Sequence, residues 1–319
     1  MNLSVIPSDH IDELIEKSML YRYSRKFLRE LKEYKKTNDS EALHQLRVYS
    51  RRLLATFDFF STNIPAEIKE KGYKKIKQFH NALNLTRDSH VQIKFFKRLC
   101  KDNIEYKSVC SEIIHFIRKQ DIKHKKELVN TFKRISKSHI LFEILQFSKQ
   151  KQNKTYKQLS PSNIKIFGSY CAKMVRPLLT KFNNNSRNFP DSEMQEELHK
   201  CRLLVKKIRY NLEILKPFFH SLNKYFKIIL EFQTKLGEIQ DCNICMAYLD
   251  KFELHLSKEK IKYSNEEHDK YFEKLNKIKA LRISERKNSH QQLIRINKKI
   301  TLADIEKNLL NIFTVKSKQ

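Results

Sequence analysis

Two stretches of this chain carry the same order of basic residues, and this repeat constrains the fold more than any other feature. The first is His44-Gln-Leu-Arg47-Val-Tyr-Ser-Arg51-Arg52, and the second is His199-Lys-Cys-Arg202-Leu-Leu-Val-Lys206-Lys207. The two histidines are 155 residues apart (199 − 44 = 155). A fixed offset between similar phrases indicates an internal duplication. We therefore expect two structural halves, residues 1–150 and 151–319, which together form one domain.

A second pair of phrases follows the first in each half. These are Leu83-Asn84-Leu-Thr-Arg87-Asp88 and Leu236-Gly237-Glu-Ile-Gln240-Asp241. Their aspartates are 153 residues apart (241 − 88 = 153), which is nearly the offset of the histidines. Two motifs that recur in the same order at nearly the same offset strengthen the expectation of a duplication.

Helical spacing places the basic residues of each phrase along one face. In the first copy, His44, Arg47 and Arg51 fall within an arc of about 60°. Beside them runs an apolar stripe that could pack into a core, formed by Leu46, Leu53, Phe57 and Phe60. The second copy extends the row over His199, Arg202, Lys206 and Arg209. A solvated charged face remains an alternative for either copy alone, but such a face needs no fixed order of residues.

The composition points to a globular protein with polyanionic partners. Lys and Arg number 65 against 36 Asp and Glu, which gives a formal net charge of +29. That excess restricts the partners to nucleic acid, polyphosphate or an anionic membrane surface. With 40% hydrophobic residues and 21 Phe, the chain can still bury a sizeable core. Only 3 Gly, 6 Pro and no Trp favour helices joined by short connections.

The pattern of apolar residues predicts an all-α protein. Candidate N-terminal caps are a capping box at Asn38–Glu41 and the phrase Ser192-x-x-Gln195, and residues 149–162 are the best linker candidate. The expected helices cover 9–36, 38–60, 65–85, 88–100, 103–119, 122–150, 163–182, 195–217, 221–236, 240–256, 265–283, 285–299 and 302–313.

The phrases resemble the motifs of the CHAD family, whose name stands for conserved histidine α-helical domain. The resemblance covers roughly residues 10–310 and rests on both halves. It implies two duplicated helical bundles, related by a pseudo-two-fold axis, that enclose a basic groove or channel for inorganic polyphosphate. The first half departs from the family pattern at Leu54, where Arg is common, and at Asn84, where Gly is usual. These departures predict a weaker site in the first half.

We expect non-catalytic binding of inorganic polyphosphate, with no cofactor and no metal. The flexible polymer offers about one negative charge per phosphate and no bases, so aligned arginines and lysines suffice to recognise it. The expected contact residues of the first half are His44, Arg47, Arg51, Arg52, Lys74, Lys77 and Arg87. Those of the second half are His199, Arg202, Lys206, Lys207, Arg209, Tyr210 and Lys227.

Other function classes remain as alternatives. Nucleic acid would be gripped by the same charge, at least nonspecifically, although no helix-turn-helix phrase, RNP-like motif or Cys/His finger is present. A metal-dependent phosphohydrolase is less well supported, because the carboxylates are scattered and there is no G-x-x-x-x-G-K-[ST] or G-x-G-x-x-G loop. A scaffold for acidic proteins would not need the repeated order of histidine and arginine.

Several single residues have more than one interpretation. His44 and His199 could donate to phosphate, pair with a neighbouring helix or, against the surrounding positive charge, bind a metal. Asp88 and Asp241 are more typical of a helix cap or an arginine partner than of a general base. Cys242 and Cys245 have the minimal redox or zinc spacing, but their place in an amphipathic helix favours two packed thiols.

The location of the protein follows from what the chain lacks. Met1–Ser18 has four acidic residues and no apolar segment of the kind found in secretory signals. No stretch has the roughly 18 to 20 apolar residues of a membrane span. We therefore expect a cytoplasmic protein with reduced cysteines, and polyphosphate granules would be its natural place of association.

Overall fold

The computed structural model describes residues 11–60, 64–149, 160–186, 189, 194–258 and 265–314. Within these residues the protein is all-α, with ten α-helices, one short 3-10 helix and no strand. The helices are α1 (Ile11–Thr37), α2 (Ser40–Phe59), α3 (Ala66–Asp102), η2 (Ile104–Tyr106), α4 (Lys107–Ser136), α5 (Ile140–Lys149), α6 (Pro161–Asn185), α7 (Gln195–Leu215), α8 (Leu222–Lys258), α9 (Asn265–Lys299) and α10 (Leu302–Thr314). The predicted fold class is confirmed.

Local signals explain where several helices begin. The carboxylate of Asp39 accepts hydrogen bonds from the backbone N–H groups of Glu41 and Ala42, both at 3.1 Å, and so caps α2. The preceding Asn38 takes a left-handed φ of 51°, which ends α1. Ser160 caps α6 in the same way, and Pro161 occupies its first turn. The predicted cap at Ser192 lies outside the described residues.

The structure corrects the predicted helix breaks. Continuous helices α3, α8 and α9 replace three predicted pairs. A fourth break was predicted near 120–121, but α4 continues to Ser136 and the turn falls at 137–139. The misread signals were polar clusters such as Leu83–Asp88, which contain no proline and can remain helical while their side chains face a polar space. Most of the predicted linker, 150–159, lies outside the described residues.

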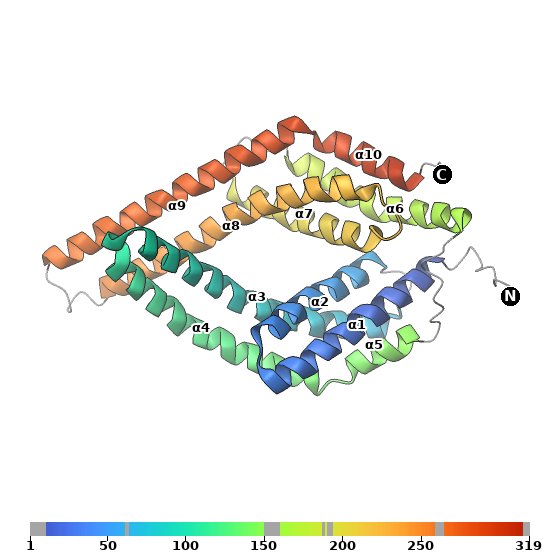
Figure 1. Cartoon of the computed structure of the whole chain (residues 1–319), viewed down its shortest axis with the longest axis horizontal. Helices are drawn as coiled ribbons and strands as arrows, with labels where there is room; N and C mark the ends of the chain where they lie inside the picture. The colour runs from blue at the N-terminus through green and yellow to red at the C-terminus, as the bar shows by residue number, and fades with distance from the viewer. Residues whose placement is uncertain are drawn as a thin grey trace.

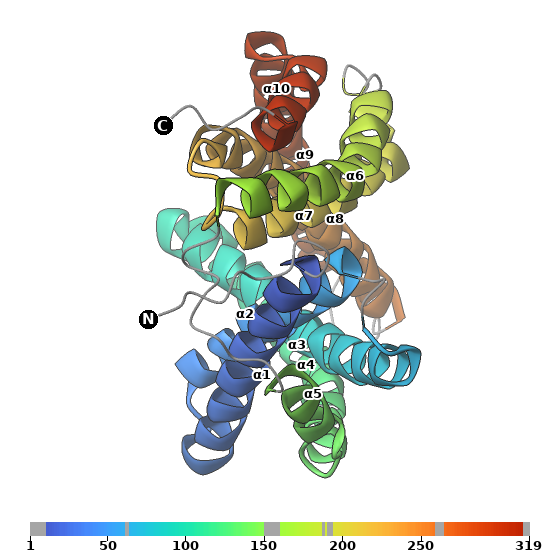
Figure 2. The same ribbon diagram turned by 90° about the vertical axis from the view of Figure 1, so that its right-hand side faces the viewer.

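The first five and last five α-helices pack in the same pattern. In the first set, α1 packs on α2 and α5, α2 packs on α3, and α3 packs on α4 and α5. In the second set, α6 packs on α7 and α10, α7 packs on α8, and α8 packs on α9 and α10. The two sets form two layers, which are seen one above the other in Figure 1 and end-on in Figure 2. Contacts of α1 with α6, α2 with α7 and α3 with α8 join the layers.

Two apolar clusters hold the layers together. The larger cluster draws on both sets of helices, and its phenylalanines meet edge to face, as Phe27 and Phe79 do at 5.6 Å and Phe182 and Phe232 at 5.8 Å. The smaller cluster joins α3 and α4 to α8 and α9 at the far end of the molecule. Burial of each such side chain contributes about 1.5–3 kcal/mol. The predicted stripe of Leu46, Leu53, Phe57 and Phe60 is fully buried, which orients the basic face of α2 away from this core.

Gly168 allows α6 and α10 to approach each other closely. A Cβ atom at this position would lie 2.1 Å from the carbonyl oxygen of Phe313, so no larger residue fits between α6 and α10. No described helix is long and apolar enough to cross a membrane.

Candidate functional site

A cavity of about 590 Å³ opens between α2, α3, α7 and α8. These four helices carry the repeated phrases, so the two halves of the chain contribute to one space. Eight of the predicted residues line it: Arg47, Arg51, Arg87, His199, Arg202, Lys206, Arg209 and Tyr210. The cavity is also lined by residues absent from the predicted contact set, namely His80, Asn84, Asp88, Gln233, Thr234, Gly237, Glu238, Gln240, Asp241 and Ile244.

Six predicted residues lie outside this lining. Five of them have exposed side chains: His44, Lys74, Lys77, Lys207 and Lys227. Lys227 lines a neighbouring cavity between α8 and α9, which shares Thr234 with the first. Arg52 is partly buried and turned toward another partner. The structure thus brings together the inner row of each basic phrase and leaves the outer residues at the surface.

Arg52 ties α2 to α7 through a carboxylate. Its Nε and Nη2 donate to Oε1 of Glu213 at 2.8 and 2.5 Å, and its guanidinium lies near the rings of Tyr23 and Tyr49. Glu213 also accepts from Arg209 at 3.0 Å. Burial disfavours the charge of Glu213, but Arg52 and Arg209 outweigh it and lower its pKa. Arg52 is therefore already neutralised inside the protein, unlike the arginines of the cavity.

The cavity carries more positive than negative charge. Its lining has six Arg and Lys side chains and three carboxylates, Asp88, Glu238 and Asp241. Each carboxylate is partnered: Arg87 lies 2.9 Å from Asp88 and 3.5 Å from Asp241, and Lys235 lies 3.0 Å from Glu238. The interpretation of Asp88 and Asp241 as arginine partners is confirmed.

Four cations of the lining lack such partners. Within the described residues, Arg47, Arg51, Arg202 and Lys206 form no ion pair with a carboxylate, as the ion pairs of this region involve other side chains. Two come from α2 and two from α7. A cavity with four uncompensated cations on opposite sides is suited to an anion.

The pKa values of the lining groups reflect this crowding. Burial, together with the neighbouring charges of Arg202 and Arg87, lowers the pKa of Lys206 to about 8. Burial and the charges of nearby cations also lower the pKa values of Arg47 and Arg51. Each cation therefore makes its neighbours harder to charge, and a bound anion would relieve that cost.

The cations of the cavity also affect the pKa of His80. Burial and the charges of Arg51, Arg47 and Lys206 lower its pKa to about 4, so the imidazole is neutral at physiological pH. Its Nδ1 lies 2.9 Å from the hydroxyl of Ser50. His80 therefore adds a polar group to the cavity without adding charge.

Three buried arginine nitrogens in the cavity lack hydrogen-bond acceptors. They are the Nε atoms of Arg51, Arg202 and Arg209, which find no partner among the described residues. Buried N–H donors are normally satisfied, so each unpaired donor calls for an explanation. The guanidinium groups of Arg51 and Arg209 both lie over the ring of Tyr210, 4.5 and 4.7 Å from its centroid. The ring holds the two arginines, one from each half, without neutralising them.

The two phrase histidines occupy different environments. The Nδ1 atom of His199 lies 2.9 Å from Oε1 of Gln240 on α8, which confirms a partner on a neighbouring helix. His199 lines the cavity, whereas His44 does not. A direct phosphate contact by either histidine stays a prediction.

The cysteines of α8 are buried free thiols. Burial raises the pKa of Cys242, and raises that of Cys245 to about 12, so neither is a ready nucleophile. This agrees with the interpretation of Cys242 and Cys245 as packed thiols. Among the described residues, no group of three or more His, Cys, Asp and Glu side chains is placed to hold a metal ion.

Sequence reasoning missed His80 and Gln233 as cavity residues. They are 153 residues apart, which is the offset of Asp88 and Asp241. Extending the second motif back along α3 and α8 at that offset would have found them.

Comparisons with known proteins identify the family. The structure of PptA from Streptomyces chartreusis is similar, with a TM-score of 0.62 at 12% sequence identity, covering 90% of this chain and 99% of that chain. The CHAD domain from the plant Ricinus communis gives a TM-score of 0.51 at 15% identity, covering 94% of this chain and 91% of that chain. At such identities the likeness shows a shared fold. No curated protein matches the sequence. The family model described as the CHAD domain matches residues 19–250, and the chain therefore belongs to the CHAD family.

Proposed function

We propose that this protein binds inorganic polyphosphate in the cavity between α2, α3, α7 and α8, without catalysis. One observation carries the proposal: cations from both halves face one space, and the buried Nε donors of Arg51, Arg202 and Arg209 lack acceptors there. Phosphate oxygens are suitable acceptors because they form short, charge-assisted bonds with guanidinium groups. The association of the CHAD family with polyphosphate supports the same assignment.

We infer that the site arose by duplication of one helical unit. The matched packing of α1–α5 and α6–α10 supports this, as does the order of the repeated phrases. The two units would be residues 1–150 and 151–319, related by a pseudo-two-fold axis that runs through the cavity. Arg47 and Arg51 would then correspond to Arg202 and Lys206, which are each 155 residues further along.

The neighbouring cavities support a channel open at both ends. The central cavity shares Thr234 with the one that contains Lys227 and Arg295. It also shares Glu238 and Asp241 with a cavity of about 500 Å³ between α3, α8 and α9. The cavity with Lys227 continues along α8, whereas the other continues along α3 toward Arg98, so a polymer longer than the central cavity could extend beyond it at two places. Lys227 would meet the polymer along α8 rather than in the centre.

Binding without turnover fits the state of the carboxylates. Phosphoryl transfer assisted by metals uses carboxylates free to hold cations. Here Asp88 and Asp241 hold Arg87, and Glu238 holds Lys235. These ion pairs explain why the three carboxylates are present, and no catalytic role is needed to account for them.

A competition titration tests the proposal. Polyphosphates of increasing length and single-stranded DNA of equal charge would be compared at one near-physiological salt concentration. We expect affinity for polyphosphate to rise with length until the channel is filled and then to level off. Long polyphosphate should outcompete the DNA, because sugars and bases fit an enclosed cavity poorly.

Charge variants locate the site. The double substitution Arg202→Gln and Lys206→Gln should remove most of the preference for polyphosphate. Lys119→Gln and Lys123→Gln form the matched control, since these exposed lysines have the same i, i+4 spacing on α4. Equal losses in both variants, or equal competition by DNA, would contradict a specific polyphosphate site.

A further inference from the structure

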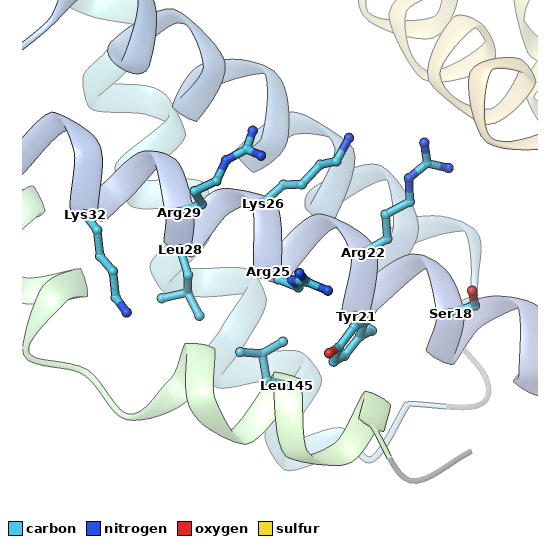
Figure 3. A pocket seen from close by; sticks show the side chains of 9 residues that line it. All are labelled: Ser18, Tyr21, Arg22, Arg25, Lys26, Leu28, Arg29, Lys32 and Leu145. Atoms are coloured by element: carbon cyan, nitrogen blue, oxygen red, sulfur yellow. The ribbon is translucent and has the colours of Figure 1, made fainter. Parts of the chain in front are cut away.

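The outward face of α1 carries a second cationic groove, which shares no residue with the cavity between the halves. It has a volume of about 830 Å³ and runs beside α1, with Leu145 of α5 at its edge (Figure 3). Five cations line it: Arg22, Arg25, Lys26, Arg29 and Lys32. From Arg22 to Lys32 the helix advances by ten residue steps, or about 15 Å at the usual rise.

The charge of this groove is weakly compensated. None of its lining residues is acidic. Arg29 pairs with Glu30, which lies outside the lining, at 2.6 Å, and Lys26 lies 5.5 Å from the centre of the Tyr49 ring. The side chains of Arg22, Lys26 and Arg29 extend to the same side of α1, whereas Lys32 extends toward the opposite side (Figure 3). A chain of negative charges laid along α1 would meet cations on both sides of the helix.

On the side of α1 that faces α5, the lining is apolar and aromatic (Figure 3). Tyr21, Leu28 and Leu145 line it, and all three are only partly buried. Within the described part of the chain, the ring of Tyr21 stacks on no other aromatic ring, as ring contacts nearby involve Tyr34, Phe27 and others. By contrast, the Tyr210 ring of the central cavity already carries Arg51 and Arg209. The outer groove therefore offers a free ring, and the inner cavity does not.

We propose that this groove binds single-stranded nucleic acid. Phosphates would contact the arginines and lysines, while bases would stack on Tyr21 and cover Leu28 and Leu145. Proteins that bind single strands without sequence preference combine a basic groove with an aromatic platform in this way. Polyphosphate has no bases and gains nothing from an apolar floor. A bilayer surface offers phosphates but no bases that could stack on Tyr21.

The experiment uses the full chain and a fluorescent single-stranded oligonucleotide. In the groove variant, Arg22, Lys26 and Arg29 are each replaced by Gln. The control variant replaces Lys119, Lys123 and Lys126 of α4 by Gln, since these exposed lysines repeat the i, i+4, i+7 spacing. We expect the groove variant to bind the oligonucleotide at least tenfold more weakly and to lower the salt slope by about 2, at roughly 0.7 for each phosphate that the groove no longer neutralises. The control should remain within about twofold of the wild type, since its lysines touch no phosphate under this proposal.

Two substitutions of Tyr21 separate stacking from charge. Tyr21→Leu keeps an apolar side chain but removes the ring, and should weaken oligonucleotide binding by about five- to tenfold, since each stacked base contributes appreciably. Tyr21→Phe should bind as the wild type does. Neither should change polyphosphate affinity. Circular dichroism and thermal melting would confirm that all variants fold.

The remaining outcomes overturn the proposal. Unchanged oligonucleotide binding by the groove variant would mean that the groove is a solvated face. Equal losses for both polyanions, or no effect of Tyr21→Leu, would reduce the groove to diffuse electrostatics. Loss of oligonucleotide binding in the Arg202→Gln, Lys206→Gln variant alone would place nucleic acid in the central cavity. Failure of polyphosphate binding there would count against the proposed function and not against this groove.

Discussion

The two sides of the central cavity carry the same number of cations but not at the same positions. Helices α2 and α3 contribute three, and α7 and α8 contribute three. Two of each set match at the offset of 155, as Arg47 and Arg51 correspond to Arg202 and Lys206. These four are also the cations without carboxylate partners. The four cations that match between the two sides are therefore the ones that are free to bind an anion.

The third cation differs between the sides. In the second half it is Arg209, whose counterpart 155 residues earlier is Leu54. In the first half it is Arg87, whose counterpart 153 residues later is Gln240. The first half thus lacks a cation on α2 but has one on α3. The departure at Leu54 predicts a weaker first-half site from the sequence, whereas the placement of Arg87 gives the two sides equal numbers of cations.

The difference between Arg87 and its counterpart Gln240 also changes the surroundings of the two phrase histidines. Gln240 shares a hydrogen bond with His199 and keeps it at the cavity. The corresponding residue in the first half is Arg87, which has no acceptor atom and is paired with Asp88 and Asp241. His44 therefore lacks the equivalent partner and lies outside the lining. Equal numbers of cations on the two sides therefore do not give the two histidines equal surroundings.

The largest expected effect concerns the matched pairs. Arg47→Gln with Arg51→Gln, and Arg202→Gln with Lys206→Gln, should each weaken polyphosphate binding by about a hundredfold or more, because a charge-assisted bond contributes about 1.5–3 kcal/mol. Calorimetry on the two double variants measures the comparison directly. A loss confined to the second pair would show that the first half is the weaker side.

Arg87 on α3 makes up for the cation that α2 lacks at Leu54, and removing Arg87 tests this compensation. Arg87→Gln gives the first half the residue type of the second and leaves Asp88 and Asp241 facing the cavity without their partner. We expect about a tenfold loss of polyphosphate affinity, the size of one charge-assisted contact. Gln240→Ala removes no charge and should change the affinity much less. Similar effects of both variants in the same titration would contradict the compensation.

The sequence predicted the fold class and the inner row of the site better than the outer residues. Helical periodicity and the apolar stripe around Phe57 identified α2 correctly, because its buried face is continuous. Polar motif residues near Asp88 and Asp241 were mistaken for helix ends, since sequence does not reveal that a polar face meets a cavity within one helix. Lys74 and Lys207 could not be separated from Arg47 by charge alone, as exposure depends on how the two layers meet.

Lys206 can lose its proton at moderately alkaline pH, whereas an arginine such as its counterpart Arg51 stays charged. The pKa of Lys206 is about 8 in the unliganded protein, and bound phosphate would raise it. Between pH 7 and pH 9.5 the free protein loses this proton, so polyphosphate affinity should fall, by up to about tenfold per pH unit above 8 until the bound form also titrates. Lys206→Arg should largely abolish this dependence, because arginine stays charged. A pH series of titrations on both proteins measures it.

The same group affects the stability of the unliganded protein. Because the folded pKa of Lys206 is lowered from 10.5, its charge destabilises the fold fully below pH 8. This penalty decreases as the pH rises from about 8 toward 10.5, so the group's contribution to stability increases over that range. Thermal melting of wild type and Lys206→Met at pH 7 should show the variant as the more stable. A less stable variant would mean that burial and the neighbouring cations do not penalise the charge of Lys206.

The smallest expected effect lies with the two histidines that define the repeat. His199→Ala removes a ring that lines the cavity and is oriented by Gln240, so polyphosphate binding should weaken by about threefold, as for one ordinary hydrogen bond. His44→Ala removes an exposed side chain outside the lining and should leave the affinity unchanged. The same titration at fixed pH and salt measures both. Equal losses would mean that the polymer extends over the outer end of α2 and contacts His44 there. Both histidines would then contribute to binding, although their surroundings differ in the structure.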